Sequence, residues 1–314
     1  MVAMGALFSM RYDDLRSNPP PLLNWALVDA SMNTFIPASS GYTLAKRGFV
    51  TLSDGRIIFV KIGTDDTTKK WINKEIDAYL FLQSNGYRHI PRLLSKRDDN
   101  TGFALEYLNE SDGWKWDTVW TELRLNKTLE AMDSLANIKT PELPDSFNKI
   151  RMIKDIKNPW QIFIDDPDAR IKLAAKLNIS NRKDISHKIF ADNFLAQSFD
   201  FKLPQNKLTH YDIRSDNCAW NANTQKVMLI DWNWIQLGNR DIDINSLLVS
   251  IIKSGFTIPS DVAHRLNKGA LMWLAGSWFG ASIGSIEGSS SEDESLREYQ
   301  LQSAIVAYEL SLGV

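Results

Sequence analysis

Apolar and polar positions alternate in the first third of the chain as they do in β-strands. Short runs rich in β-branched and aromatic residues lie at 34–37, 47–52, 56–62 and 102–108, and the residues Ser-Asp-Gly at 53–55 have the composition of a hairpin turn. A helix is predicted at 69–83. We therefore expect residues 1–107 to form a small antiparallel β-sheet with one helix.

After residue 111 the spacing of apolar residues changes to a helical one. Apolar side chains approximate a helical face near the middle of the chain and again near its end, at Leu123, Leu125, Leu129, Met132 and Leu135, and at Leu296, Tyr299, Ile305, Val306 and Leu310. Several short helical segments are broken by prolines between 141 and 205. The pattern predicts an α+β protein with a second, larger and mainly helical lobe at 108–314.

Length and charge fit an ordinary globular enzyme. A chain of 314 residues exceeds the usual size of one hydrophobic core, so two lobes are expected. Hydrophobic residues at 44% and charged residues at 24% are globular values. A net charge of −2 supplies no basic field, so nucleic acid is not an expected partner.

The cysteine count and the longest apolar stretch bear on the compartment. Cys218 is the only cysteine and cannot form an intrachain disulfide, which favours a reducing compartment such as the cytoplasm. The apolar stretch at 270–283 has the length of a buried helix and is shorter than a membrane span. We expect a cytoplasmic protein without a membrane segment, either a monomer or a homodimer.

The candidate chemistry is concentrated in the segments 208–217, LTHYDIRSDN, and 227–232, VMLIDW. They place His210, Asp212, Asn217 and Asp231 in the order of the protein kinase pattern H-R-D-x-x-x-x-N with a later aspartate after a hydrophobic strand. Transfer of a phosphoryl group needs a carboxylate near the incoming hydroxyl, which predicts that role for Asp212. Helix caps or turn aspartates are the alternative interpretation of the two aspartates. We assign His210 a structural role.

Two further residues of this pattern are candidate metal ligands. Asn217 and Asp231 carry the hard oxygen atoms that magnesium prefers. The apolar run at 227–230 is expected to be a buried strand that delivers Asp231 at its end. The expected cofactors are therefore ATP and Mg2+.

Three segments of the chain resemble the aminoglycoside phosphotransferase and choline kinase-like family, which has the protein kinase-like fold. They read HYDIRSDN at 210–217, LIDW at 229–232 and GNRDIDIN at 238–245, where the family typically carries H-G-D-x-x-x-x-N, I-D-W and D-P-x-x-D-L-A. The resemblance implies that Asp243 braces the catalytic loop from a buried helix. Tyr211 departs from the pattern because it stands where the family usually has glycine.

The resemblance also implies which residues hold the nucleotide. Lys61 closes the strand at 57–62 and is expected to contact the phosphates and to pair with Glu75, with Asp77 as the fallback partner. An edge-strand lysine that points to water is the alternative for Lys61. The phosphate-covering loop corresponds to 38–43, and its members with the best chemistry for a phosphate cradle are Ser39, Ser40 and Gly41. An ordinary turn explains that run equally well.

A hinge between the lobes is expected where the strand at 102–108 ends. The resemblance implies that the backbone of Glu106, Tyr107 and Leu108 binds the edge of the adenine. A hinge binds through its backbone and does not require particular side chains, so this part of the pattern has low specificity.

Arg214 has two competing interpretations. It lies two residues beyond Asp212, where protein kinases have a lysine that touches the transferred phosphate, and a guanidinium suits phosphate oxygens. A solvent-facing ion pair with Asp216 is the rival interpretation. We therefore include Arg214 with Asp212 among the candidate catalytic residues, and turnover of an Arg214→Ala variant would decide between the two.

The acceptor is the least determined part of the function. Tryptophans cluster near the predicted hinge and beside Asp231, and their faces suit a cationic amine or a sugar ring, although most large aromatics fill cores; they are Trp114, Trp116, Trp120, Trp232 and Trp234. The sequence predicts an ATP- and Mg-dependent phosphotransferase acting on a hydroxyl of a small molecule, which is aminoglycoside-, amino-alcohol- or sugar-like. A nucleotide-binding regulatory pseudokinase without turnover is the alternative.

Overall fold

The chain divides into two compact units. The computed structural model describes residues 23–38, 44–116, 119–139, 143–148, 158–190, 201, 203–204, 206–284 and 291–313. One unit comprises residues 1–150 and 207–237, and the other comprises residues 151–206 and 238–314. The first unit thus includes a later segment of the chain, and the lobe boundary at 107/108 stays a prediction.

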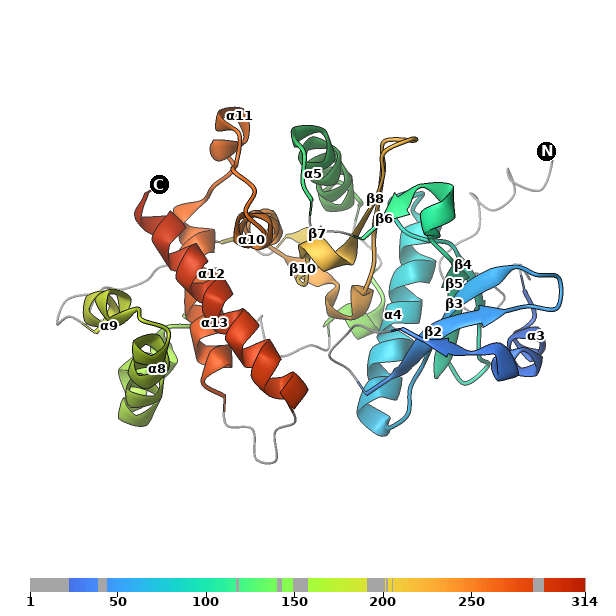
Figure 1. The fold of residues 1–314 in the computed structure, drawn as a ribbon, viewed down its shortest axis with the longest axis horizontal. Coiled ribbons are helices and arrows are strands. Elements are labelled where there is room, and N and C mark those ends of the chain that lie inside the picture. The colour runs from blue at the N-terminus through green and yellow to red at the C-terminus, as the bar shows by residue number, and fades with distance from the viewer. Residues whose placement is uncertain are drawn as a thin grey trace. The chain divides into compact units, whose positions relative to one another are not determined.

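A five-stranded antiparallel sheet forms the framework of the first unit (Figure 1). Its strands, in the order β1-β2-β3-β5-β4, are β1 (Ile36–Pro37), β2 (Lys46–Thr51), β3 (Ile57–Ile62), β4 (Leu93–Lys96) and β5 (Gly102–Glu106). The expected hairpin joins β2 and β3, and Gly55 provides the left-handed turn residue with φ of +83°. The predicted antiparallel sheet is confirmed, and β3 is its central strand.

Two of the predicted strand boundaries were wrong. The run expected at 34–37 is a strand only at β1, because Thr34 ends a 3-10 turn, η2 (Met32–Thr34). The Thr34 hydroxyl caps that turn by donating to the Ser31 carbonyl at 2.8 Å. The strand expected at 102–108 ends at Glu106, two residues before the predicted end.

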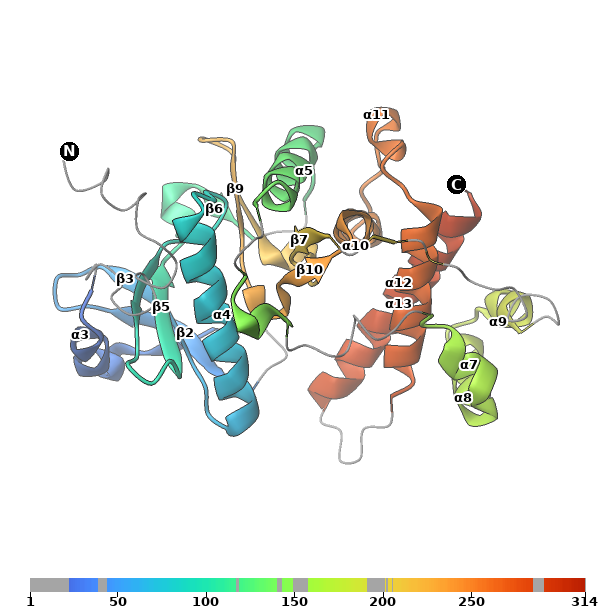
Figure 2. The ribbon, with the colours of Figure 1, turned by 180° about the vertical axis from the view of Figure 1, so that it is seen from behind.

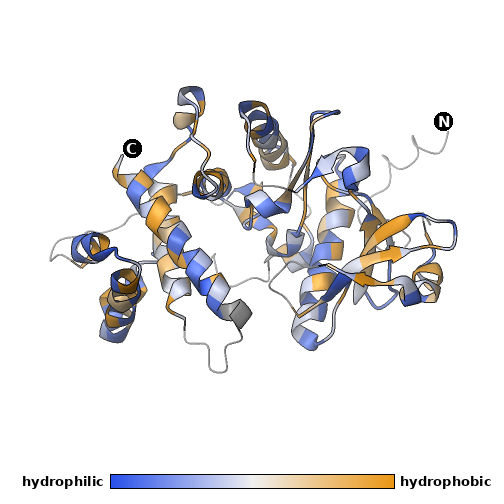
Figure 3. Ribbon diagram, in the orientation of Figure 1, coloured by the Kyte–Doolittle hydropathy of each residue, from blue (hydrophilic) through white to orange (hydrophobic). Residues whose placement is uncertain are grey.

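The two faces of this sheet are covered by different helices. The short helix α3 (Trp25–Ala30) packs on the face formed by an aliphatic cluster, which includes Val50, Ile58, Val60 and Ala104. The long helix α4 (Asp66–Ser84) lies on the opposite side, as Figures 1 and 2 show. Figure 3 shows apolar residues along the strands between them. Because β-strand side chains alternate, Lys61 projects from the face opposite its buried neighbour Val60.

Helix α4 begins at a well-defined cap. The Asp65 carboxylate accepts from the Thr68 backbone amide at 2.8 Å, and the Thr68 hydroxyl receives the Asp65 amide at 3.0 Å. This reciprocal capping box fixes the first turn of the helix. The helix therefore starts before the predicted 69–83 and carries Glu75 and Asp77 on its buried surface.

The rest of the first unit combines one helix with short strands. Its elements are η3 (Glu110–Asp112), β6 (Trp114–Lys115), α5 (Glu122–Ala136), η4 (Asp145–Asn148), β7 (Lys207–Thr209), η5 (Ser215–Asn217), β8 (Cys218–Asn221), β9 (Lys226–Leu229), η6 (Trp232–Trp234) and β10 (Gln236–Gly238). Strands β6, β8 and β9 form one small sheet, and β7 pairs with β10. The strand expected at 227–230 is confirmed as β9. Together these strands frame the segment from His210 to Asn217.

Helices make up most of the described part of the second unit. It contains α7 (Gln161–Asp165), α8 (Pro167–Ile179), α9 (Lys183–Ile189), α10 (Arg240–Lys253), α11 (Ser260–Ala263), α12 (Lys268–Ser282) and α13 (Ser291–Leu312). The predicted helical character of this part of the chain is confirmed, including a buried helix at 270–283. Within the described ranges, no helix is both long enough and apolar enough to span a membrane.

Helix α12 is the centre of the second unit. The indole nitrogen of Trp160 donates to the carbonyl of Met272 at 2.9 Å, and Trp160 is fully buried. A Cβ atom at Gly276 would lie 2.7 Å from that indole nitrogen, so only glycine admits this contact.

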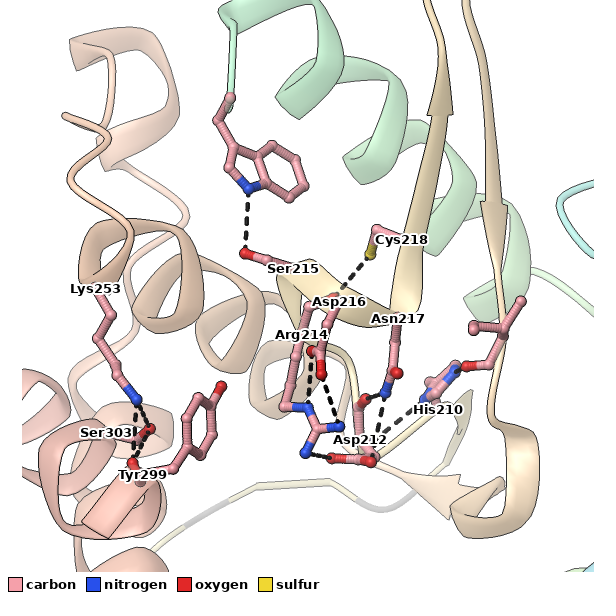
Figure 4. Close-up of polar contacts among 12 residues, drawn as sticks. His210, Asp212, Arg214, Ser215, Asp216, Asn217, Cys218, Lys253, Tyr299 and Ser303 are labelled. Carbon is pink, nitrogen blue, oxygen red and sulfur yellow. Dashed lines mark hydrogen bonds and ion pairs between the residues drawn. The ribbon is translucent and has the colours of Figure 1, made fainter. Parts of the chain in front are cut away.

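Lys253 ties α10 to α13, because its ammonium donates to Ser303 at 2.8 Å and to the Tyr299 carbonyl at 3.1 Å (Figure 4).

Candidate functional site

The first part of the site is a lysine held between two carboxylates, which we call the lysine cluster: Lys61, Glu75 and Asp231. The Lys61 ammonium donates to Glu75 Oε2 at 2.7 Å and to Asp231 Oδ1 at 2.8 Å. Lys61 lies on the central strand and is 8% exposed, so the alternative of an edge lysine pointing to water is wrong. Glu75 is the partner that the sequence favoured. The fallback, Asp77, accepts instead from the Ser146 hydroxyl at 2.7 Å.

Burial and charge act in opposite directions within the lysine cluster. Burial lowers the pKa of Lys61, but the two carboxylates outweigh it and leave the lysine protonated with a pKa above its ordinary value. Burial raises the pKa of Glu75 to about 7, against the attraction of Lys61. Burial likewise raises the pKa of Asp231, but Lys61 dominates and leaves that pKa below its ordinary value. Asp231 is therefore an ionised carboxylate at neutral pH.

The second part of the site is the 210–218 loop, which carries Asp212 and Asn217. The Asn217 side-chain amide donates to the Asp212 carbonyl at 2.7 Å and lies 3.4 Å from Asp212 Oδ2. The Ile230 backbone amide donates to the Asn217 carbonyl at 3.1 Å, so Asp231 follows directly on a residue bound to this loop. Asp212, Asn217 and Asp231 thus belong to one connected network (Figure 4 shows the first two).

The pKa of the Asp212 carboxyl lies near neutral pH. Burial raises its pKa to about 7, and Asp231 and Asp216 add to the rise, while Arg214 and the Asn217 amide oppose it. A quarter of the side chain remains exposed to solvent. A carboxylate that is partly accessible and titrates near pH 7 suits a group that accepts a proton from a substrate.

Two residues of the network have a left-handed backbone. Tyr211 has φ of +63° and Asp231 has φ of +67°. Non-glycine residues adopt this conformation at a cost of about 1 kcal/mol or more, and such strain gathers at functional sites. The left-handed φ at 211 also gives the physical reason for a glycine at this position of the H-G-D pattern, and Tyr211 meets the same backbone requirement with a side chain.

His210 connects the loop to the strand before Asp231. Its Nε2 lies 2.9 Å from the Ile230 carbonyl, and its Nδ1 lies 3.3 Å from the Asp212 backbone amide. Burial lowers the pKa of His210 to about 4, so the ring is neutral, with a donor at Nε2 and an acceptor at Nδ1. The ring also packs on Trp232 at 4.3 Å between centroids. This is the geometry of the structural role that we assigned to it.

Arg214 makes the ion pair that its rival interpretation required. Its guanidinium contacts Asp216 through two hydrogen bonds of 3.1 and 3.2 Å, and it lies 3.6 Å from Asp212 Oδ1. Figure 4 shows these side chains directed toward one another. Asp216 is largely exposed, with 60% of its side chain accessible, so solvent weakens that pair. Contact with a transferred phosphate stays a prediction.

The predicted hinge, Glu106 to Leu108, begins at the last residue of β5. The Glu106 side chain is occupied, because it accepts from the Arg92 backbone amide at 3.0 Å and from Arg92 Nε at 2.9 Å. The Tyr107 ring packs on Phe49 of β2 at 4.6 Å. Binding of an adenine edge by these residues stays a prediction, as does the role of Ser39, Ser40 and Gly41, which lie outside the described residues.

Asn217 and Asp231 each carry a side-chain oxygen of the kind that magnesium prefers. The Asn217 amide nitrogen is committed to Asp212, and one Asp231 oxygen to Lys61. In the described part of the chain, neither the Asn217 amide oxygen nor Asp231 Oδ2 accepts a hydrogen bond. One carboxylate and one amide oxygen, with phosphate oxygens completing the shell, are the ligands that magnesium takes at nucleotide sites.

Comparison with solved structures decides the fold. The ethanolamine kinase of Plasmodium vivax matches with a TM-score of 0.53 and 13% identity, over 86% of this chain and 81% of that one. The choline kinase LicA of Streptococcus pneumoniae matches with a TM-score of 0.52 and 12% identity, over 90% and 98% of the two chains. APH(2")-IIa in complex with gentamicin matches with a TM-score of 0.50 and 14% identity, over 93% and 97%.

The chain has the protein kinase-like fold. The fold and the resemblance that predicted it are confirmed together, since these neighbours are ethanolamine and choline kinases and an APH enzyme. No protein-family model matches the sequence, and no curated protein matches it either. At these identities the likeness concerns the arrangement of the backbone, and the chemistry must be inferred from this chain's own residues.

Arg124 was not among the residues that the sequence analysis selected. It is 1% exposed in α5, far from 210–218 along the chain, yet it donates to the Cys218 carbonyl at 2.9 Å. Trp120 was a candidate for acceptor binding, but it is buried and its indole donates to Ser215 at 3.1 Å. The one hint in the sequence is that Trp120 and Arg124, an aromatic residue and a cation, lie four positions apart at the start of a helix.

Proposed function

We propose that this protein is an ATP- and magnesium-dependent phosphotransferase that moves the γ-phosphoryl group of ATP to a hydroxyl of a small molecule. One observation carries the proposal: the ammonium of Lys61 binds Glu75 and Asp231 at 2.7 and 2.8 Å, within the unit that also joins Asp212 to Asn217. A kinase-like fold with no such cluster would support nothing beyond a scaffold. A buried lysine paired with two carboxylates supports the proposal, because phosphoryl transfer uses charged groups of this kind.

Asp212 is the proposed base of the transfer. The acceptor hydroxyl gives its proton to the Asp212 carboxylate while its oxygen forms a bond to the γ-phosphorus, and the bond from that phosphorus to the oxygen of ADP breaks. A pKa of about 7 allows Asp212 to be ionised before the reaction and to hold a proton after it. In-line displacement requires the acceptor oxygen and the leaving oxygen of ADP to lie on opposite sides of the γ-phosphorus, which is a matter of positioning.

The phosphates of ATP and the magnesium ion are proposed to be bound by Lys61, Asn217 and Asp231. The Lys61 ammonium would bind the α- and β-phosphates while Glu75 holds it in place. Asn217 and Asp231 would hold magnesium, which neutralises charge on the phosphate oxygens. Arg214 is the proposed additional cation near Asp212, at 3.6 Å in this structure.

The acceptor proposed is an amino-alcohol-, aminoglycoside- or sugar-like molecule. The similar structures are named for ethanolamine, for choline and for a complex with gentamicin, and these molecules combine a hydroxyl with a cationic amine. We propose a cytoplasmic reaction by a monomer or homodimer, in keeping with the free, buried thiol of Cys218.

Transfer of phosphate to a panel of acceptors tests the proposal. Choline, ethanolamine, aminoglycosides and amino sugars would each be incubated with ATP and magnesium, and the phosphorylated product detected directly. Thermal shift with nucleotide measures binding in the same samples, because a ligand that binds the folded state raises its stability. Product formation with any member supports the enzyme. Nucleotide binding with no product from any member would favour a regulatory pseudokinase, and no binding would contradict both.

A further inference from the structure

Two buried side chains, one just before α5 and one in its first turn, contact the C-terminal end of the 210–218 loop. The Trp120 indole nitrogen donates to the Ser215 hydroxyl at 3.1 Å, and Arg124 donates from one guanidinium nitrogen to the Cys218 carbonyl at 2.9 Å. All four residues are nearly or fully buried, with exposed fractions of 6%, 5%, 1% and 1% for Trp120, Ser215, Arg124 and Cys218. Figure 4 shows Ser215 and Cys218 at the two ends of the same short turn.

Trp120 and Arg124 also bind each other. The guanidinium carbon of Arg124 lies 4.2 Å from the centroid of the Trp120 ring, within the range of a cation–π contact. A second guanidinium nitrogen donates to the Val119 carbonyl at 2.8 Å, next to Trp120 in the chain. A buried cation is costly unless it has partners, and two hydrogen bonds and the ring contact hold this guanidinium at a fixed position. The pair is therefore a rigid unit with two separate contacts to the loop.

The positions held by this pair bracket the residues of the proposed transfer. Between Ser215 and Cys218 lies Asn217, whose side chain binds Asp212. The Arg214 carbonyl accepts from the Asn217 backbone amide at 3.0 Å and from the Cys218 thiol at 3.1 Å, which closes the turn. A shift of the Cys218 carbonyl or of Ser215 thus moves Asn217, and Asp212 with it.

We propose that Trp120 and Arg124 are positioning residues that fix the 210–218 loop in its reactive geometry. They act on the loop through Ser215 and Cys218. Small displacements of a catalytic group lower turnover strongly while leaving binding groups on other elements in place. The catalytic consequence rests on the proposed phosphotransferase activity, whereas the loop-holding role stands by itself.

The chain provides its own reporter for the loop. Cys218 is the only cysteine among 314 residues, so a thiol reagent reports on one position. Cys218 is 1% exposed, so a reagent reaches its thiol only when the loop opens. The labelling rate of the native, full-length protein by a disulfide reagent therefore measures how often the loop opens.

The variants are chosen to remove one contact each. Trp120→Phe removes the indole donor and keeps the ring, Arg124→Met removes the guanidinium and keeps the stem, and Arg124→Lys keeps the charge. Each of the first two is expected to raise the labelling rate about tenfold or more, since a buried hydrogen bond of this kind is lost. Arg124→Lys should fall between Arg124→Met and wild type, because an ammonium reaches one carbonyl only.

Matched controls use the same substitutions elsewhere in the unit. Trp25→Phe also removes an indole hydrogen bond, the 3.0 Å contact to Asp29 in α3. Lys127→Met removes a cation from the same helix α5, where Lys127 pairs with the exposed Glu130. Both should label at the wild-type rate. Thermal unfolding of every variant would establish that the labelling is measured on folded protein.

Kinetics complete the test. In an active enzyme, kcat of Trp120→Phe and Arg124→Met should fall about tenfold or more with the KM for ATP within twofold of wild type. Labelling rates equal to those of the controls would overturn the proposal, and so would kcat and KM that change together in proportion to lost thermal stability. If the wild-type chain transfers no phosphate, the proposed function fails, and the labelling rates alone decide whether the pair holds the loop.

Discussion

The two parts of the site differ in how tightly their charges are satisfied. In the lysine cluster, one buried cation contacts Glu75 and Asp231 at under 3 Å. In the 210–218 loop, the Asp212 carboxylate has only longer contacts, 3.4 Å to Asn217 and 3.6 Å to Arg214, and a quarter of it is exposed. The first arrangement suits binding of a charged ligand at a preformed site. The second leaves a carboxylate whose proton can be exchanged, which suits chemistry.

This contrast separates the expected effects of mutation. A residue that holds the phosphates should change the nucleotide Kd, whereas a residue that takes a proton should change kcat. Raised pKa values near 7 occur on both sides, at Glu75 and Asp212, but Glu75 is 2% exposed and bound to Lys61, so only Asp212 is open to a substrate. The predictions below test that division, in order of decreasing effect.

Asp212→Asn should have the largest effect on turnover. The amide keeps the size of the side chain but cannot accept the hydroxyl proton, so kcat should fall by about 10²–10⁴, the usual contribution of a positioned base. The nucleotide Kd, measured by calorimetry, should remain within a few-fold of wild type. A variant with unchanged kcat would remove Asp212 from the mechanism.

Lys61→Met should weaken nucleotide binding, whereas Asp212→Asn should lower kcat. Hydrogen bonds to charged groups contribute about 1.5–3 kcal/mol, which corresponds to a rise of about 10–100-fold in the nucleotide Kd. Lys70→Met, which removes an exposed lysine of α4, is the matched control and should bind as wild type does. Equal Kd values for the two variants would show that Lys61 does not hold the phosphates.

The pH dependence of the reaction should follow Asp212. Because burial raises the pKa of Asp212 to about 7, the carboxyl is protonated below that pH and cannot accept a proton. The value of kcat/KM for the acceptor should therefore fall about tenfold between the plateau and pH 6, with a slope of one. A profile that stays flat down to pH 5 would mean that the reactive carboxyl has an ordinary pKa.

Opposite shifts of that profile should follow from Arg214 and Asp216, with smaller effects. Arg214 lowers the pKa of Asp212 and Asp216 raises it, so Arg214→Met should move the inflection to higher pH and Asp216→Asn to lower pH. The plateau decides between the two interpretations of Arg214. If the guanidinium binds the γ-phosphate, kcat of Arg214→Met falls at pH 9 as well, whereas a mere ion pair leaves that plateau intact.

The sequence predicted the parts of the site that depend on local order. The spacing of Asp212, Asn217 and Asp231, and a lysine in an apolar strand, are visible without coordinates. The hairpin at 53–55 was predictable because Gly55 needs a positive φ. Local pattern therefore sufficed for the sheet and for the candidate residues themselves.

Contacts between distant segments could not be predicted in this way. Trp120 and Ser215 are 95 residues apart, and Arg124 and Cys218 are 94 apart, so only the folded chain reveals these bonds. The left-handed backbone of Tyr211 was hidden because a tyrosine rarely adopts it. The role of Arg214 remained open between contact with the phosphate and an ion pair with Asp216, because spacing along the chain does not show where its side chain points.

The magnesium dependence of ATP binding tests the central claim most directly. Calorimetric titration of ATP with and without magnesium would be carried out on the wild-type protein and on Asp231→Asn, which cannot supply the carboxylate ligand. We predict that magnesium tightens ATP binding to the wild type and that this gain is largely lost in Asp231→Asn. ATP binding that ignores magnesium in both proteins, or no ATP binding at all, would contradict the assignment of Lys61, Asp212, Asn217 and Asp231 to a phosphotransferase site.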